Sequence, residues 1–564
     1  MYGQVQGKMV KSSKRHAVRE IKVVVSQRVL DGFESSANLK VIKARATKKR
    51  YISEKQLLIE GFENPFDQKL DANNRWIVLS KVIPWDMLAS LYRKQMYNHN
   101  TGAEGINARL ILGSVIIKHM LVISDREVIE QIKENMYLQY FVGYSSFTHE
   151  APFDASLFVQ IRKRLNKDVM NQINESVVLP YAAIFGDESK SERKEGKEQV
   201  ATTKRDEDEE IQKPFSPDKE DNIKPEGDSG AISAIEEQKR THIGKLLMDA
   251  TTAPQAIKFP TDLDLLNQSR IKTDALIDCI CATVDETERP RTYRKKAQKE
   301  YLNVAKKKRK SNKEIRKAIK QQLQYLNRNH RVIDRLLDTN KKFRFNKHQL
   351  KYYFVTKTLY DQQLEMYLKK EHKVDDRITS THQPYVRPMV TGKAAAKTEF
   401  GSKLQVGLIN GYALLDVISW DAFNECGSLI ESVNKYKRRF GFYPEEVLAD
   451  KIYWTNGNRS FLKGLGIKLA AKPLGRPPAV PIHLRPGDRN PIEGKFGQAK
   501  SAYGLNKIKA KLKNTSESWI ASIVLILNLV KIAGSVSYCL YQAILDSWLF
   551  IRSSILHTKL RLIY

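Results

Sequence analysis

Apolar residues recur at helical spacing between Trp76 and about Val178, and this spacing predicts a group of short helices. One apolar helix runs from Ala108 to Met120, and an S-x-x-E capping box at Ser124 and Glu127 opens the next. A later helix has one apolar and one basic face, and the basic face is formed by Arg162, Lys163 and Arg164. Consecutive short helices that end in a basic one are typical of a helix-turn-helix DNA-binding domain, although an ordinary helical bundle has the same pattern.

The pattern changes to short apolar strands and long helices after residue 240. A strand, Lys245–Met248, ends at Asp249, and apolar positions then return to helical spacing at 262–284. Residues 291–338 are predicted to form long basic helices.

The pair Asn410-Gly411 predicts a β-hairpin with strands at 403–409 and 412–418, because Asn-Gly accepts the positive φ angles of a type I′ turn. The elements that follow are a helix to about Arg439, a short strand Val447–Ala449 that ends at Asp450, a strand at 466–471, and a helix opened by Pro491 that carries Glu493. This order of elements is that of an RNase H-like sheet with a helical insertion. We therefore predict an α/β fold with an RNase H-like mixed sheet core and a helical insertion, preceded by an all-α, helix-turn-helix-like N-terminal domain.

Three acids are predicted to converge in such a sheet. Its first and fourth strands lie side by side, so Asp249 and Asp450 meet, and Glu493 closes the cluster from the later helix. Converging carboxylates repel one another and favour a hard divalent cation such as Mg²⁺ or Mn²⁺. Two such ions, roughly 3.5–4 Å apart, activate the attacking oxygen and stabilise the leaving oxygen in phosphoryl transfer. A single acid at a strand end is more often a turn residue, and other aspartates compete for the role: Asp262, Asp264, Asp416, Asp421 and Asp488.

The charge balance indicates a polyanionic partner. The chain has 96 Lys and Arg residues against 64 Asp and Glu, a formal net charge of +32 and a pI near 9.7, and nucleic acid is the default partner for such a protein. Between Arg291 and Lys320 there are 14 basic residues but only two acids, Glu300 and Glu314, which favours helices that contact phosphates. The predicted contacts are Lys306, Lys307, Lys308 and Arg309. A basic protein with solvated charge runs is the alternative.

Composition divides the chain into five segments. They are a basic N-terminal arm (1–70), a helical DNA-binding domain (71–186), a disordered acidic linker (187–240), a catalytic domain (241–535) whose helical insertion spans about 262–385, and a helical tail (536–564). The linker contains the acidic run Asp206–Glu210 and few large apolar residues, so it buries too little surface to offset its ordering entropy.

Cysteine usage and apolar runs indicate a cytoplasmic protein. The four cysteines are too scattered for a disulfide framework, and no export signal is visible before Val10. The apolar run Trp519–Val530 is broken by Lys531, and a buried helix or a dimer face is preferred to a membrane hairpin.

Three blocks, Leu247–Ala253, Val447–Tyr453 and Arg489–Lys500, resemble the catalytic blocks of bacterial insertion-sequence DDE transposases. The similarity is to the branch named for insertion sequence five and its InsH-like relatives, and it covers roughly residues 70–180 and 240–535. The third block is the most specific, because it joins Arg489, Glu493 and Lys500 at the family's spacing. The Tyr that the family often has three residues before this Arg is replaced by Pro486.

The resemblance implies a DNA transposase that binds the terminal inverted repeats of an insertion sequence and catalyses metal-dependent strand cleavage and strand transfer. It implies a homodimer on DNA, associated with the bacterial nucleoid, with two Mg²⁺ or Mn²⁺ ions held by Asp249, Asp450 and Glu493. Arg489 and Lys500 would hold the DNA backbone from the same helical face as Glu493. Two alternatives stay open, namely a nuclease of the same fold without strand transfer and a DNA-binding repressor that has lost catalysis. The presence of all three acids argues against the repressor.

Overall fold

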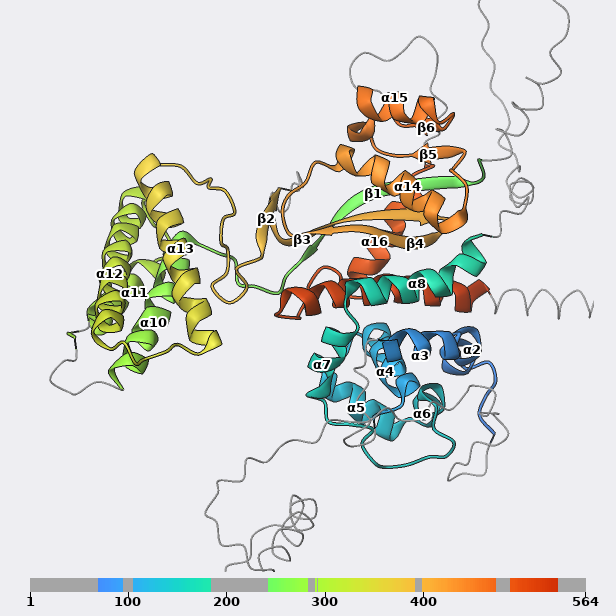
Figure 1. Ribbon diagram of the computed structural model, residues 1–564, viewed down its shortest axis with the longest axis horizontal. Helices are drawn as coiled ribbons and strands as arrows, with labels where there is room; N and C mark the ends of the chain where they lie inside the picture. Colours follow the sequence, from blue (N-terminus) through green and yellow to red (C-terminus); the bar gives the residue numbers. More distant parts are fainter. Residues whose placement is uncertain are drawn as a thin grey trace, which may run out of the picture. The chain divides into compact units, whose positions relative to one another are not determined.

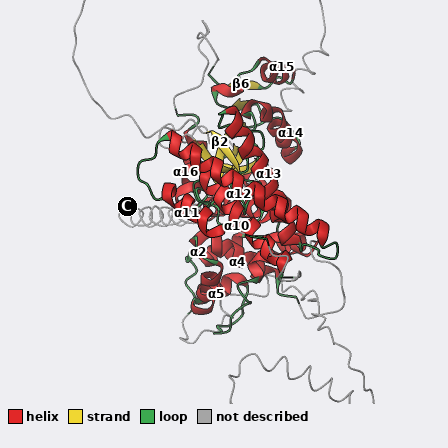
Figure 2. Cartoon of the chain, turned by 90° about the vertical axis from the view of Figure 1, so that its left-hand side faces the viewer, coloured by secondary structure: helices red, strands yellow, loops and turns green. Residues whose placement is uncertain are grey.

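The computed structural model describes residues 69–94, 105–183, 242–282, 290–291, 293–390, 398–472 and 487–535 (Figure 1). Apart from Gly105, all of them belong to one compact unit. These residues form a mixed α/β fold, with many helices and one mixed sheet (Figure 2). The predicted basic arm up to residue 68, the acidic linker 187–240 and the tail 536–564 lie outside the described residues.

The N-terminal part is helical, as the apolar spacing predicts. Its helices are α2 (Arg75–Val82), α3 (Trp85–Lys94), α4 (Ala108–Leu121), α5 (Asp125–Glu134), α6 (Met136–Val142), α7 (Leu157–Arg164) and α8 (Lys167–Ala182). Ser124 caps α5, since its hydroxyl accepts the backbone N–H of Glu127 at 3.2 Å, which is one half of the predicted capping box. The buried ring of Trp85 meets Phe141 edge-on with centroids 5.3 Å apart, so α3 and α6 share one core.

The sheet consists of β1 (Lys245–Pro254), β2 (Arg387–Val390), β3 (Thr398–Ile409), β4 (Tyr412–Ser419), β5 (Glu446–Leu448) and β6 (Lys468–Ala470). Its order is β2-β3-β1-β5-β6, with β4 paired to β3. Strand β1 is antiparallel to β3 and parallel to β5, and β5 is parallel to β6. The predicted β3–β4 hairpin is confirmed, with φ of 49° at Asn410 and 77° at Gly411, as a type I′ turn requires.

The prediction that the first strand ends at Asp249 is wrong. Strand β1 continues to Pro254, because residues 250–254 pair in register with 401–405 of the long strand β3. Asp249 therefore lies in the middle of a strand, where its pairing with Val406 of β3 fixes its backbone. Only the pairing with β5, which stops at Leu247 opposite Leu448, ends near it.

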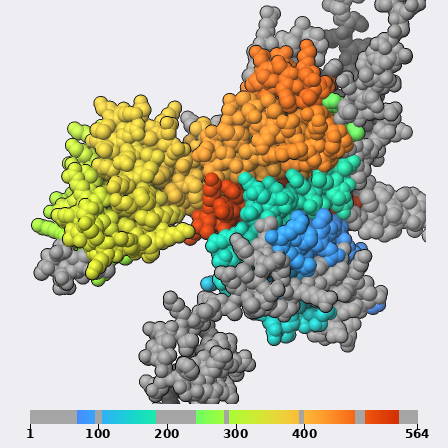
Figure 3. Space-filling model, viewed as in Figure 1, coloured from blue at the N-terminus to red at the C-terminus, as the bar shows by residue number. Residues whose placement is uncertain are grey.

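A helical insertion connects β1 to β2. Its helices are α10 (Asp262–Cys281), α11 (Arg294–Ala305), α12 (Asn312–Thr339) and α13 (Lys347–Lys369), of which α13 is not singled out by the apolar spacing. Its buried apolar side chains form clusters of their own between α10, α12 and α13, separate from the main core. Figure 3 shows the insertion as one continuous body, in yellow-green to yellow.

After β4 come the 3₁₀ turn η5 (Glu425–Ser428), helix α14 (Leu429–Phe440), the 3₁₀ turn η6 (Lys451–Tyr453), α15 (Asn456–Gly464) and α16 (Asn490–Ser501). Pro491 stands in the first turn of α16, as predicted. Both α14 and α16 pack against β1.

Among the described residues, the helix Lys513–Ser535 is long and apolar enough to span a membrane by length and composition, and 67% of its most apolar window is buried. Its Asn528 is fully buried and joins three elements by hydrogen bonds. The amide of Asn528 donates to Asn174 of α8 at 2.8 Å and to the carbonyl of Ala413 of β4 at 2.7 Å, and its oxygen accepts the Ala413 N–H at 2.8 Å. This helix is therefore part of the common core of the N-terminal helices and the sheet.

Candidate active site

Asp249 and Asp450 follow adjacent parallel strands at the same level. Leu247 of β1 pairs with Leu448 of β5, and each aspartate stands two residues further on, which places both on one side of the sheet. The expectation that the strands before these two aspartates lie side by side is confirmed.

Arg489 joins the two aspartates. It precedes α16, and its guanidinium lies 2.9 Å from Oδ2 of Asp249 and 3.2 Å from Oδ1 of Asp450. The side chain of Arg489 is 20% exposed, and its Nε is buried without a hydrogen-bond partner. The residue that was expected to hold DNA thus supplies the positive charge between the two acids.

Glu493 stands one turn further along α16 and faces an open pocket of about 320 Å³. The pocket is lined by Ala250, Thr251, Thr252, Met389, Val390, Lys403, Ala422, Glu425, Glu493, Phe496 and Lys500. Glu493 and Lys500 therefore share one pocket, as their common helical face predicts, and β1 residues that directly follow Asp249 form its wall. Among the described residues, no three acidic, histidine or cysteine side chains are grouped closely enough to hold a metal ion.

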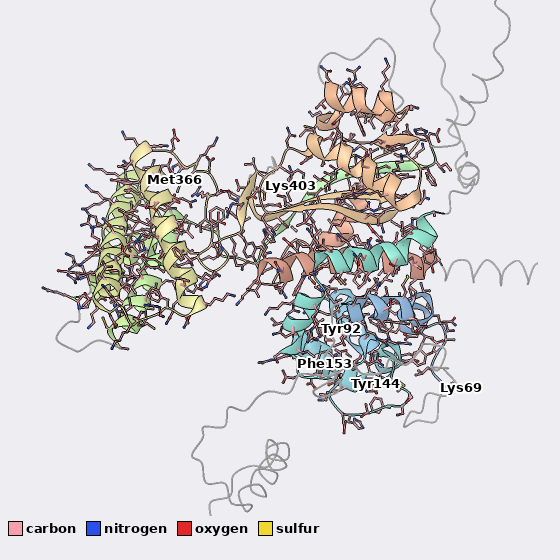
Figure 4. The ribbon with its side chains drawn as sticks, in the orientation of Figure 1. Lys69, Tyr92, Tyr144, Phe153, Met366 and Lys403 are labelled. Atoms are coloured by element: carbon pink, nitrogen blue, oxygen red, sulfur yellow. The ribbon has the colours of Figure 1, made fainter. Side chains whose placement is uncertain are left out.

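Glu425 is a further acid at this site that the sequence motifs do not identify. Its carboxylate lies 2.9 Å from Nζ of Lys403, which is labelled in Figure 4, and it lines the same pocket as Glu493. It comes from η5, a turn with no strand-end or helical pattern. The feature of the sequence that could have pointed to Glu425 is its position soon after the hairpin. Asp421 shares this position, so the sequence does not distinguish the two acids.

Gln405 of β3 holds the two turns that carry Glu425 and Asp450. It is fully buried, and its side-chain oxygen accepts the hydroxyls of Ser428 and Tyr453, each at 2.9 Å. Because Ser428 ends η5 and Tyr453 ends η6, both turns are tied to the same strand.

Burial raises the pKa of Asp249 to about 6. The backbone N–H of Ala250, which donates to its carboxylate at 2.8 Å, and the Arg489 guanidinium lower the pKa, whereas the negative charges of Glu425 and Asp450 raise it. The ionised form of Asp249 is therefore costly without additional positive charge.

The donors at this site are of the chemical type that a hard divalent cation prefers, but among the described residues they are not grouped as a metal site. The acids that approach one another offer only carboxylate oxygens, and a partly buried acid with a raised pKa gains from a cation beside it. In the present side-chain positions, the guanidinium of Arg489 forms an ion pair with one oxygen of Asp249 and one oxygen of Asp450.

The other predicted DNA contacts differ in their surroundings. Arg162 is 8% exposed and its guanidinium donates to both carboxylate oxygens of Asp125, at 2.9 and 2.8 Å, so in the structure it stabilises the helical domain. Lys163 is exposed, and Arg164 donates to the hydroxyl of Tyr92 at 3.3 Å.

The basic cluster of the insertion is exposed on the protein surface. Lys306, Lys308 and Arg309 are exposed, whereas Lys307 is held 2.5 Å from Glu314. Three of these four predicted contacts thus have no ion pair among the described residues.

Two protein families match parts of the chain. The family described as a transposase domain (DUF772) matches residues 64–164, and the family described as a transposase DDE domain matches residues 447–530. The second match contains Asp450, Glu493 and Lys500, whereas Asp249 lies before it. Both matched families are described as transposase domains, and each match covers part of the chain.

An uncharacterized protein of Rhizobium meliloti, described as ORF8 in the nfe locus, is 31% identical over 121 residues. The aligned part is 21% of this chain and 56% of that protein, so the chain spans about half the length of this relative. No solved structure matches the chain.

Proposed function

We propose that this chain is a DNA transposase that binds the terminal inverted repeats of an insertion sequence, cleaves DNA at these ends and joins the freed 3′ ends to target DNA. One observation carries the proposal: Asp249 and Asp450, 201 residues apart in the sequence, approach the same Arg489 guanidinium at the start of the helix that bears Glu493. A purely structural protein has no need to bring these two acids together, because partly buried acids cost stability.

We further propose that the sheet is an RNase H-like core and that the branch is that of insertion sequence five. The strand order β4-β3-β1-β5-β6, with β5 and β6 parallel to β1, supports this fold, since it brings the first and fourth strands of the core together. The segments 71–186 and 241–535 would be the DNA-binding and catalytic domains.

Asp249, Asp450 and Glu493 are the residues that would hold the divalent cations, two Mg²⁺ or Mn²⁺ ions. When bound, such ions supply Lewis acidity to the attacking and leaving oxygens of a phosphodiester. The residues of the chain position the DNA. Arg489 and Lys500 bind backbone phosphates, which fixes the register of the scissile bond without reading bases.

Lys163 and Arg164 on α7 would contact DNA from the N-terminal domain, which we propose to be helix-turn-helix-like, and Arg162 would support this face through its pair with Asp125. The N-terminal domain would hold the ends of the element. The whole protein would act as a homodimer in the bacterial cytoplasm. The exposed basic residues Lys306, Lys308 and Arg309 add a contact from the insertion.

The experiment compares cleavage and binding on duplexes that carry the ends of the element. Asp249→Asn, Asp450→Asn and Glu493→Gln should each lower Mg²⁺-dependent cleavage by about 10³-fold or more and leave end binding within about twofold. Asp338→Asn, at an exposed acid on α12, is the matched control and should cleave like the wild type. Wild-type cleavage by any of the three site variants would show that its acid is misassigned.

Strand transfer is tested separately, with pre-cleaved ends and a supercoiled target plasmid. Joined products from the wild type would distinguish a transposase from a nuclease of the same fold. Cleavage without any joined product would contradict the transposase proposal and leave the nuclease.

A further inference from the structure

The helical insertion is a module with its own hydrophobic core. One cluster contains Leu276, Ile333 and Tyr352, another contains Leu266 and Leu326, and all of these side chains come from α10, α12 and α13. Helix α11 contributes one fully buried side chain, Ala297. The exposed residues of α11 are Lys295, Lys296, Gln298, Lys299 and Asn303, so one side of this helix is not used for packing.

Some basic residues of the insertion contact other residues of the insertion, and others form no such contact. Of the 14 Lys and Arg residues between 291 and 320, Arg294 pairs with Asp278, Lys307 pairs with Glu314, Arg316 donates to the carbonyl of Tyr367, and Arg291 lies over the ring of Tyr293. The other ten are exposed and form no ion pair with any residue that the structure describes. These ten like charges, on α11, on α12 and on the short connection between them, repel one another, and a polyanion would relieve this repulsion.

Three of these lysines, two in α11 and one at its C-cap, lie along one stripe. Lys295, Lys299 and Lys306 line a shallow hollow of about 560 Å³ together with Gln298, Leu302 and Asn303. The residues recur every three or four positions, so they share one helical face. At about 1.5 Å per residue the stripe is about 16 Å long, which corresponds to about five base pairs of duplex DNA.

We propose that this stripe, which we call the α11 stripe (Lys295, Lys299 and Lys306), is a binding site for the phosphate backbone of duplex DNA, independent of base sequence. The inference rests on the proposed function, because it gives the same enzyme a second DNA-binding surface outside its catalytic site. Lysines are point charges that suit phosphate contacts, and no acidic side chain lines the hollow to repel a phosphate.

The lining of the hollow also argues against other polyanions. Single-stranded nucleic acid is held by aromatic side chains that stack on bases, and no aromatic residue lines the hollow. An acidic protein partner needs a desolvated apolar centre, and Leu302 is the one large apolar side chain among the lining residues. Duplex DNA, which is bound mainly through its charge, fits these residues best.

The test uses the full-length protein and a labelled duplex of arbitrary sequence without element ends. The triple variant Lys295→Ala, Lys299→Ala, Lys306→Ala removes the α11 stripe at exposed helix positions, where alanine is well tolerated. The matched control, Lys341→Ala, Lys342→Ala, Lys347→Ala, removes the same charge at exposed positions, two after α12 and one at the start of α13. Helix α11 packs along the first half of α12, since Gln322 donates to the carbonyl of Ala297 and Tyr325 donates to Glu300. The control lysines lie past the other end of α12, beyond Thr339.

The stripe variant should bind the duplex about tenfold or more weakly, with the slope of log affinity against log salt reduced by about two to three. The control should lose less than about threefold. Binding should fall equally for duplexes of different sequence and fall less for single strands. A second version with Lys→Gln at the three stripe positions should behave like the alanine version, which separates charge loss from altered packing.

Equal losses in the stripe variant and the control would overturn the proposal, because net charge alone would explain them. Unchanged duplex binding would overturn it as well. A larger loss for single strands or for an acidic peptide than for duplex DNA would assign the stripe to that partner instead. If the wild type never cleaves element ends but the stripe variant still loses duplex binding, the proposed function fails and the α11 site stands.

Discussion

The guanidinium of Arg489 lies 2.9 Å from the carboxylate of Asp249 and ties the start of α16 to the middle of β1. Asp249 is partly buried, so this contact offsets part of the cost of its charge. The same guanidinium reaches Asp450 at 3.2 Å. Arg489 therefore supplies the positive charge between the two acids, a charge that a bound divalent cation would otherwise supply.

Removal of Arg489 should strengthen divalent cation binding in the absence of DNA. Arg489→Ala leaves Asp249 and Asp450 without their counter-ion, and we expect the apparent Mg²⁺ affinity to rise by about threefold to tenfold. The measurement is the thermal unfolding midpoint as a function of Mg²⁺ concentration. Arg489→Lys keeps the charge and should stay closer to the wild type. An affinity that Arg489→Ala leaves unchanged would contradict competition between Arg489 and the cation.

Replacement of Glu425 should have the opposite effect on the cation. Glu425→Gln removes a negative charge that acts on Asp249, so the apparent Mg²⁺ affinity should fall by about threefold to tenfold in the same titration. The control is Glu431→Gln, at an exposed acid that pairs with Lys435 on α14. If Glu425→Gln and its control behave alike, Glu425 does not contribute to the charge of the site.

Asp125 should be important for the stability of the N-terminal helices. Its carboxylate accepts from Arg162 and lies 2.6 Å from Lys118, and these two cations are 9% and 3% exposed at their side chains. Asp125→Asn leaves both buried cations without a counter-ion, so we expect a loss of about 2–4 kcal/mol in the free energy of unfolding of this domain. Urea unfolding measured by tryptophan fluorescence checks this. The neighbouring Glu130→Gln, which disrupts an exposed pair with Lys133, should cost less than about 0.5 kcal/mol.

Acid should destabilise the helical insertion through His330. The pKa of His330 is lowered from 6.5 to about 4, mainly by burial between α12 and α13; Asp334 opposes this shift and Lys357 adds to it. The unfolded chain binds the proton at higher pH than the folded one does, so the contribution of neutral His330 is fully present above about pH 6.5. It is lost as the pH falls from about 6.5 to about 4, by about 3 kcal/mol in total.

The check is the urea midpoint of the insertion, measured at several pH values. His330→Gln should lose much of this pH dependence, whereas His372→Gln, at an exposed histidine, should keep it. A wild type and a His330→Gln variant with the same pH dependence would show that His330 is not the group responsible.

Much of the fold follows from local pattern. The apolar spacing of Ala108–Leu121, the Asn410-Gly411 turn and Pro491 at the start of α16 are determined by backbone preferences within a few residues, and the structure has these elements where the sequence predicts them. The adjacency of the strands before Asp249 and Asp450 follows from the order of elements. The resemblance of three short blocks then singles out two aspartates and Glu493 among the many acids of the chain.

What the sequence by itself determined was therefore the type of most elements, the strongly basic character and the acids that carry the proposed chemistry. The tertiary structure alone decided the partners of these residues. It extended β1 beyond Asp249 through pairing with β3, directed Arg162 toward Asp125, and placed Glu425 and Arg489 beside the acids. The physical reason is that element type depends on neighbours in the chain, whereas ion pairs, burial and strand ends depend on residues that are distant in sequence and meet only in the folded protein.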